Sequence, residues 1–118
     1  MKKVVLDTNF ILSCIRKKID FFEEIKLMGL KPIIPEEVVS EITKFKEKKP
    51  EAELALKIIK KNNYKKIELG KGHVDKKIIN YSKKYPEIII ATLDREIKNK
   101  TKNHKLVIRG NKKLELVS

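Results

Sequence analysis

Residues 88–94, Ile-Ile-Ile-Ala-Thr-Leu-Asp, carry the strongest strand signal in the chain and decide its fold class. An uninterrupted run of β-branched residues is typical of a strand that is covered on both faces, as in a parallel sheet. Similar but weaker runs lie at residues 4–6, 33–34, 66–69 and 106–108, and residues 114–116 could add a short edge strand. The sequence therefore predicts a mostly parallel, five-stranded sheet.

The segments between these runs show the spacing of amphipathic helices. Apolar residues recur every three or four positions, which predicts helices at residues 9–18, 20–28, 35–45, 51–62, 73–85 and 93–101. Pro35 is expected at the first position of the third helix, followed by Glu36 and Glu37 in its first turn. Alternating strands and helices indicate a three-layer α/β/α fold, and 118 residues suit a single domain spanning residues 1–118.

The charge of the chain is strongly positive. Lys and Arg number 29 against 16 Asp and Glu, which gives a net charge of +13. Such a surface attracts polyanions, of which nucleic acid ranks first and anionic lipid second. Nearly all of the basic residues are Lys, however, and a Lys-rich surface is also typical of thermophilic proteins. Both explanations of the charge remain open at this point.

Composition also bears on the compartment. No apolar run approaches the roughly 18 residues that a membrane-spanning helix needs. The single cysteine, Cys14, has no partner for an internal disulfide, so a reducing, cytoplasmic setting is expected.

Two aspartates follow apolar strands. Asp7 ends the run Val4-Val5-Leu6, and Asp94 follows Ala91 closely. In open α/β sheets, ligands bind beyond the carboxyl ends of the strands, at the point where the strand order reverses. The alternative role for either residue is to cap the helix that follows it.

Two further acids flank apolar helix stripes. Glu41 lies at the margin of the stripe of the 35–45 helix, whereas Glu36 and Glu37 are expected to point further away. Asp75 lies in the first turn of the 73–85 helix. The alternatives are a solvated position for Glu41 and a favourable interaction with the helix dipole for Asp75.

Asp7, Glu41, Asp75 and Asp94 would repel one another in one cleft unless cations joined them. An all-oxygen ligand set favours one or two Mg²⁺ or Mn²⁺ ions, because His73 and His104 are isolated and lack ligand spacing. Two such ions can activate a water and stabilise the leaving oxygen in phosphodiester hydrolysis. A metal-dependent nuclease is therefore the leading hypothesis.

These motifs together resemble the PIN-domain ribonuclease family, whose four acids occur in this order. The likeness is carried by Val5-Leu6-Asp7-Thr8-Asn9-Phe10, Pro35-Glu36-Glu37-Val38-Val39-Ser40-Glu41-Ile42, Val74-Asp75-Lys76-Lys77-Ile78 and Ala91-Thr92-Leu93-Asp94-Arg95-Glu96-Ile97-Lys98. The stretch from Val107 to Leu114 is similar to the branch that includes small-subunit pre-ribosomal-RNA processing proteins and their archaeal relatives.

The resemblance implies a sheet of order 3-2-1-4-5, with Asp7, Glu41, Asp75 and Asp94 as catalytic metal ligands and Asn9 and Thr92 in support. It implies an endoribonuclease of ribosomal RNA processing that acts on an RNA precursor, and it leaves a homodimer open. Basic residues near the end of the chain are expected to contact RNA: Lys98, Lys100, Lys102, Lys105, Arg109, Lys112 and Lys113.

Two alternatives stay open beside this reading. A toxin–antitoxin ribonuclease would share the same four acids. A non-catalytic RNA-binding or ribosome assembly factor on the same fold is favoured by Lys76, which stands where the ribosomal branch often has a second acid. A phosphatase acting through Asp7 ranks lower, because the sequence Asp7-Thr8-Asn9 lacks the second aspartate of a two-aspartate motif.

Overall fold

The sheet at the centre of the molecule has six strands in the order β3-β2-β1-β4-β5-β6. The computed structural model describes residues 2–110 and 112–118. All neighbouring strands are parallel except β5 and β6, which are antiparallel. The strands are β1 (Lys3–Leu6), β2 (Lys31–Pro35), β3 (Lys65–Ile67), β4 (Ile89–Ala91), β5 (Lys105–Arg109) and β6 (Lys113–Val117).

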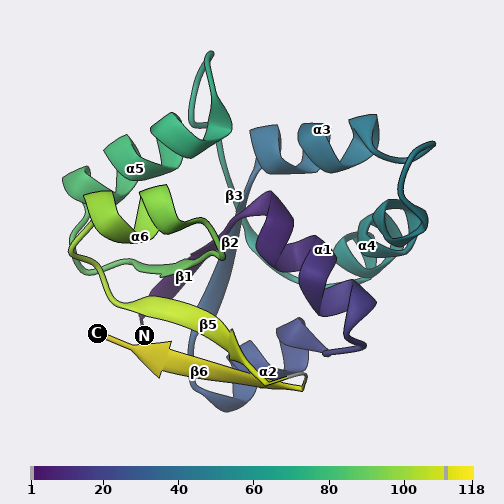
Figure 1. Ribbon diagram of the computed structural model, residues 1–118, viewed down its shortest axis with the longest axis horizontal. Helices are drawn as coiled ribbons and strands as arrows, with labels where there is room; N and C mark the ends of the chain where they lie inside the picture. Colours follow the sequence, from purple (N-terminus) through teal and green to yellow (C-terminus); the bar gives the residue numbers. More distant parts are fainter. Residues whose placement is uncertain (1, 111) are drawn as a thin grey trace.

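Helices cover both faces of this sheet (Figure 1). Helix α1 packs against α3 and α4 on one side, whereas α5 packs against α6 on the other. The crossovers from β1 through β2 to β3 run across the sheet in one direction, and those from β3 through β4 to β5 run in the other. Right-handed crossovers in opposite directions place their helices on opposite faces of the sheet. The helices are α1 (Thr8–Arg16), α2 (Phe21–Leu27), α3 (Glu36–Lys44), α4 (Pro50–Lys61), α5 (Val74–Lys84) and α6 (Arg95–Lys100).

The predicted three-layer fold and the order 3-2-1-4-5 are confirmed. Val4, Val5 and Leu6 in β1 are fully buried, as expected for a strand between two helical layers. The sheet differs from the prediction in one respect. Residues 113–117 form a full sixth strand that pairs antiparallel with β5, rather than a short optional edge.

Two local predictions are wrong. Pro35 is the last residue of β2 and the N-cap of α3, so the helix begins one residue later than expected. The apolar spacing of residues 51–62 predicts a stripe of Leu54, Ile58 and Ile59 on this helix, but Leu54 is 49% exposed. Ala52, Ala55 and Ile59 supply the buried face of that helix, because α4 packs closely against α1 and α3 and small residues allow that approach.

Strand β1 marks the point where the strand order reverses. It pairs with β2 on one side and β4 on the other. The backbone N–H of Asp7 continues the pairing beyond Leu6 by donating to the carbonyl of Ala91 at 3.0 Å. The carboxyl ends of β1 and β4 therefore lie side by side. Ligands bind at this position in open α/β sheets.

The described part of the chain has no helix that is both long and apolar enough to cross a membrane.

Candidate active site

The four predicted acids follow the carboxyl ends of four adjacent strands. Asp7 comes directly after β1, and Asp94 is the N-cap of α6 just beyond β4. Glu41 lies on α3, which follows β2, and Asp75 lies in the first turn of α5, which follows β3. The fold thus brings to one end of the sheet residues that are far apart in the sequence.

Asp7 is buried and held by two hydrogen bonds. Its side chain is 2% exposed. One carboxylate oxygen, Oδ1, accepts from the backbone N–H of Thr8 at 2.8 Å, and the other, Oδ2, accepts from the hydroxyl of Thr92 at 3.1 Å. A capping side chain ordinarily bonds to the second or third N–H of its helix, so the bond to Thr8 differs from an ordinary cap.

Thr92 connects Asp7 to Asp94. Its fully buried hydroxyl donates to Asp7 and accepts from the backbone N–H of Asp94 at 3.0 Å. Asp94 in turn caps α6, because its Oδ1 accepts from the N–H of Glu96 at 2.7 Å and of Ile97 at 3.4 Å. One threonine therefore orients the acids that follow β1 and β4.

The pKa of Asp7 shows how crowded this site is. The pKa of Asp7 is raised to about 6, mainly by burial and also by the negative charges of Asp75 and Glu41. The hydrogen bonds from Thr92 and from the Thr8 N–H oppose the rise. Asp7 is therefore within electrostatic range of two of the other predicted acids.

Asp75 completes the set of interactions among the four acids. Its pKa is raised by partial burial, then by the charge of Asp94 and by contact with it, and then by the charges of Glu41 and Glu96. Lys76, which suggested a weakened site, is exposed and is not among the groups that shift the pKa of Asp75. The lysine thus lies beside the acids in sequence without neutralising them.

The chemistry of this donor set fits a divalent cation. All of the side chains offer carboxylate oxygens, which suit Mg²⁺ and Mn²⁺, and their mutual repulsion would be relieved by positive charge. The buried hydroxyl of Thr8 has no hydrogen-bond partner among the described residues, which leaves it available to water. Within residues 2–110 and 112–118, no three His, Cys, Asp or Glu side chains are already close enough to hold an ion, so binding would draw the carboxylates together.

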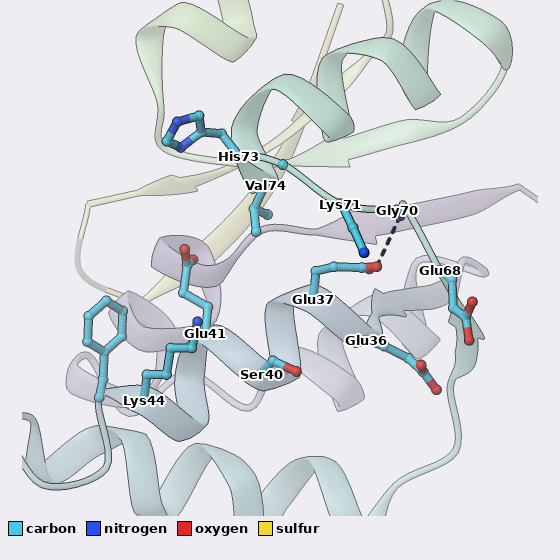
Figure 2. A pocket seen from close by; sticks show the side chains of 12 residues that line it. Glu36, Glu37, Ser40, Glu41, Lys44, Glu68, Gly70, Lys71, His73 and Val74 are labelled. Carbon is cyan, nitrogen blue, oxygen red and sulfur yellow. Dashed lines mark hydrogen bonds between the residues drawn. The ribbon is translucent and has the colours of Figure 1, made fainter.

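A groove adjoins the acids on the α3 side. It has a volume of about 760 Å³ and runs between α3 and the loop from Glu68 to Val74. Glu41 is the predicted acid that lines it, and Lys44 and Lys71 lie along the same groove (Figure 2). Glu36, Glu37 and Glu68 line this groove as well, so Glu41 stands at the edge of the acidic cluster in a groove with more carboxylates than ammonium groups.

Glu37 was overlooked in the sequence. Its carboxylate accepts from the backbone N–H groups of Leu69 at 3.0 Å and Gly70 at 3.1 Å, so it holds the loop that leads to Asp75 (Figure 2). Partial burial opposes ionisation, yet these N–H groups lower the pKa of Glu37 overall. Glu36 and Glu37 were expected to point further from the apolar stripe than Glu41, yet both line the same groove as Glu41. Glu37 and Glu41 are four residues apart and share one face of α3.

Glu96 is a second residue that sequence reasoning missed. Its charge raises the pKa of Asp75, and its carboxylate pairs with the Lys100 ammonium at 2.8 Å. Asn9, expected to support the acids, is exposed on α1 and makes no side-chain hydrogen bond to the described residues. Thr92, not Asn9, makes the orienting contacts that the structure shows.

The residues that were expected to contact RNA differ in how exposed they are. Lys98 is half-buried, and Lys102, Arg109, Lys112 and Lys113 are exposed. The Arg109 guanidinium is paired with Glu115 at 3.1 Å. Asn111, within the closing motif, lies outside the described residues.

The expectation for Lys105 is wrong. Its side chain is 8% exposed, and its ammonium donates to the carbonyls of Thr101 and Asn103. Burial and the charge of Lys98 lower the pKa of Lys105. The lysine thus closes the end of α6 and is not free to contact a phosphate.

Comparison with known proteins assigns the chain to a family. Residues 4–110 match the family model described as a PIN-like domain. The chain belongs to that family.

Individual relatives agree with this assignment. The chain is 32% identical to Ribonuclease VapC4 of Methanocaldococcus jannaschii, in an alignment that covers 98% of this chain and 97% of that protein. Among solved structures, the PIN domain endonuclease Utp24 superposes with a TM-score of 0.81 at 24% identity, covering 97% of this chain and 90% of that one. A domain of a functionally unknown protein from Methanocaldococcus jannaschii gives a TM-score of 0.64 at 22% identity, covering 100% and 99%. The two structural likenesses concern the fold alone.

Proposed function

We propose that the chain is a metal-dependent endoribonuclease whose active site is formed by Asp7, Glu41, Asp75 and Asp94. The observation that carries this proposal is the mutual interaction of these four carboxylates where the strand order reverses, in a chain of the PIN-like family. The ribonuclease name of the VapC4 relative supports RNA as the substrate.

The reaction is hydrolysis of a phosphodiester bond. A water oxygen forms a bond to phosphorus, the bond from phosphorus to the leaving oxygen breaks, and that oxygen takes up a proton. A divalent cation bound by the carboxylates would supply positive charge to the scissile phosphate and lower the pKa of the attacking water. Thr92 bonds to the Asp7 carboxylate and to the Asp94 backbone N–H, and Glu37 holds the loop that leads to Asp75.

For the cellular role we propose ribosomal RNA processing in the cytoplasm, with a precursor RNA as the partner. The likeness of residues 107–114 to the processing branch supports this role. A toxin–antitoxin ribonuclease is the second candidate, because it would share the same four acids, and the near-complete alignment with Ribonuclease VapC4 supports ribonuclease activity for either role.

Cleavage of a circular single-stranded RNA tests the activity, because only an endonuclease can open a circle. Wild-type protein with Mn²⁺ or Mg²⁺ should linearise the circle, and excess EDTA should stop the reaction. Tight RNA binding without cleavage under any of these metals would instead favour the non-catalytic RNA-binding factor.

A second experiment separates the two cellular roles. A processing enzyme should cut precursor ribosomal RNA from its own organism at one or a few positions. A toxin should arrest growth when it is expressed alone, and the product of a neighbouring gene should relieve the arrest. Growth arrest of that kind would overturn the processing role but leave the ribonuclease proposal intact.

A further inference from the structure

A second groove lies between helix α5 and the amino ends of strands β1 and β3, away from the acidic cluster. It has a volume of about 490 Å³, and its lining includes Lys2, Lys3, Lys65, Tyr81 and Tyr85. A neighbouring hollow along α5 shares the two tyrosines, so the surface continues on their other side. We refer to the lysines and tyrosines named here as the β3–α5 groove.

Two lysines of this groove face each other. Lys3 is on β1 and Lys65 on β3, and both side chains line the same groove although β2 separates the two strands. The pKa of Lys3 is lowered, first by contact with the Lys65 ammonium and then by its charge, while Glu87 acts in the opposite direction. An anion between two such ammonium groups would relieve their repulsion.

The tyrosines supply an aromatic surface beside this lysine pair. The rings of Tyr81 and Tyr85 pack against each other at an interplanar angle of 51°, with 4.9 Å between their centroids. Tyr85 is 37% exposed, and the Lys84 ammonium lies 5.7 Å from the centre of its ring. Aromatic rings next to lysines form the combination by which proteins hold single-stranded nucleic acid, because an unpaired base stacks on the ring while the lysines bind the backbone.

We propose that the β3–α5 groove binds single-stranded RNA, with a phosphate between Lys3 and Lys65 and a base stacked on Tyr85. This inference rests on the proposed function for the identity of the ligand. Lys3 and Asp7 are four residues apart on extended backbone, so the lysine pair and the acids lie at opposite ends of β1, separated by about 13 Å. RNA held in this groove is therefore anchored away from the bond that is cut.

The experiment measures binding of a fluorescein-labelled single-stranded RNA of about twelve nucleotides in EDTA, where no cleavage occurs. The test variant is Lys3→Glu with Lys65→Glu. The matched control is Lys26→Glu with Lys57→Glu, which changes the net charge equally at exposed positions outside the groove. We expect the test variant to bind at least tenfold more weakly with a smaller salt slope, and the control to lose no more than about threefold.

Two more variants separate stacking from charge. Tyr85→Phe should bind RNA like wild type, and Tyr85→Leu should bind about tenfold more weakly, since leucine fills space without offering a stacking face. Melting curves accompany every variant, and Lys3→Gln with Lys65→Gln replaces the charge reversal if that protein does not fold. Equal losses for test and control variants, or equal binding by Phe and Leu at position 85, would overturn the groove assignment.

The outcome is independent of the cleavage proposal. Cleavage of RNA by a protein whose groove variants bind like the control would refute the groove and leave the enzyme standing. Groove-dependent binding by a protein that cleaves no RNA would support the groove and refute the ribonuclease activity.

Discussion

The two ends of the sheet crowd charges of opposite sign. At the carboxyl end, the pKa of Asp7 and that of Asp75 are raised, mainly by burial and also by neighbouring acids. At the amino end, the pKa of Lys3 is lowered, first by contact with Lys65. Each end would therefore gain from a countercharge: a divalent cation among the acids and a phosphate between the lysines.

The ends differ in how firmly their side chains are held. Asp7 is 2% exposed and both of its oxygens accept hydrogen bonds. Lys3 is half-buried and Lys65 is exposed, and both have long side chains. Chemistry needs fixed donors and acceptors, whereas binding a polyanion tolerates mobile charges. We therefore expect substitutions at the carboxyl end to reduce cleavage and those at the amino end to reduce binding.

The largest effect is expected for Asp7→Asn. Loss of one carboxylate from the site should reduce metal-dependent cleavage by at least about a hundredfold, a few kcal/mol of barrier. RNA binding in EDTA should be unchanged, because no lysine is altered. Cleavage and binding assays on the same preparation check both expectations.

Asp20→Asn is the matched control. Asp20 is an exposed N-cap whose side chain accepts from the Glu23 N–H, so the same substitution tests capping without touching the acidic cluster. Asn caps helices about as well as Asp, and this variant should keep full activity. If Asp7→Asn behaved like Asp20→Asn, Asp7 would be a cap and not a site residue.

Asp7→Asn should also change how the stability of the protein depends on pH. The pKa of Asp7 is about 6 in the folded protein against 3.8 ordinarily. Between about pH 4 and pH 6, Asp7 is protonated in the folded protein and ionised in the unfolded chain. The free energy of unfolding of the wild type therefore falls as the pH rises through this range. The full penalty above pH 7 is about 3 kcal/mol as an upper estimate.

Denaturation in EDTA at several pH values measures this term. The free energy of unfolding of Asp7→Asn minus that of wild type should grow between pH 4 and 6 and stay level above pH 7. The increase in the free energy of unfolding will be smaller than the upper estimate. If the amide nitrogen of the new side chain faces Thr92, the threonine hydroxyl loses the oxygen to which it donates. A difference that does not vary with pH would contradict the raised pKa of Asp7.

Thr92→Val should have a smaller effect on cleavage. Valine keeps the shape of threonine but removes the hydroxyl that bonds to Asp7 and to the Asp94 N–H. Partners that orient metal ligands typically contribute ten- to a hundredfold, so we expect a loss of about tenfold in kcat. Thr92→Ser should restore most of the activity. Equal losses for Ser and Val would mean that the methyl packing of Thr92 matters and its hydroxyl does not.

The smallest effect, on RNA affinity, is expected for lysines at the beginning of β6. Lys112 and Lys113 are exposed, and replacing both with Gln should lower the slope of log affinity against log salt by about one to two. Lys26→Gln with Lys57→Gln serves as the control. Titrations of labelled RNA at several salt concentrations give the slopes, and identical slopes for both pairs would assign these lysines to general surface charge.

Much of this molecule could be predicted because its signals are local. The β-branched run at residues 88–91 indicates a strand covered on both faces, and β4 is buried there. Asp7 and Asp94 could be identified because both follow such strands, and parallel strands end at the same edge. The strand order itself came from the family resemblance.

The features that were missed depend on contacts between distant segments. Glu37 binds N–H groups of Leu69 and Gly70, more than thirty residues away. Lys105 bonds to carbonyls only four and two residues away, but its burial depends on β4 and β6, which pair with β5 on either side of it. No local pattern encodes either arrangement, because each depends on how α3, α6 and β6 pack in three dimensions.

The most direct test of the account is the position of a divalent cation. Crystals soaked in Mn²⁺ would give anomalous density wherever the ion binds. We predict a peak among the carboxylates of Asp7, Glu41, Asp75 and Asp94, with Thr92 still bonded to Asp7, and no such peak in crystals of Asp7→Asn. A well-ordered crystal with no peak at these carboxylates, or with its strongest peak elsewhere on the molecule, would contradict the central claim.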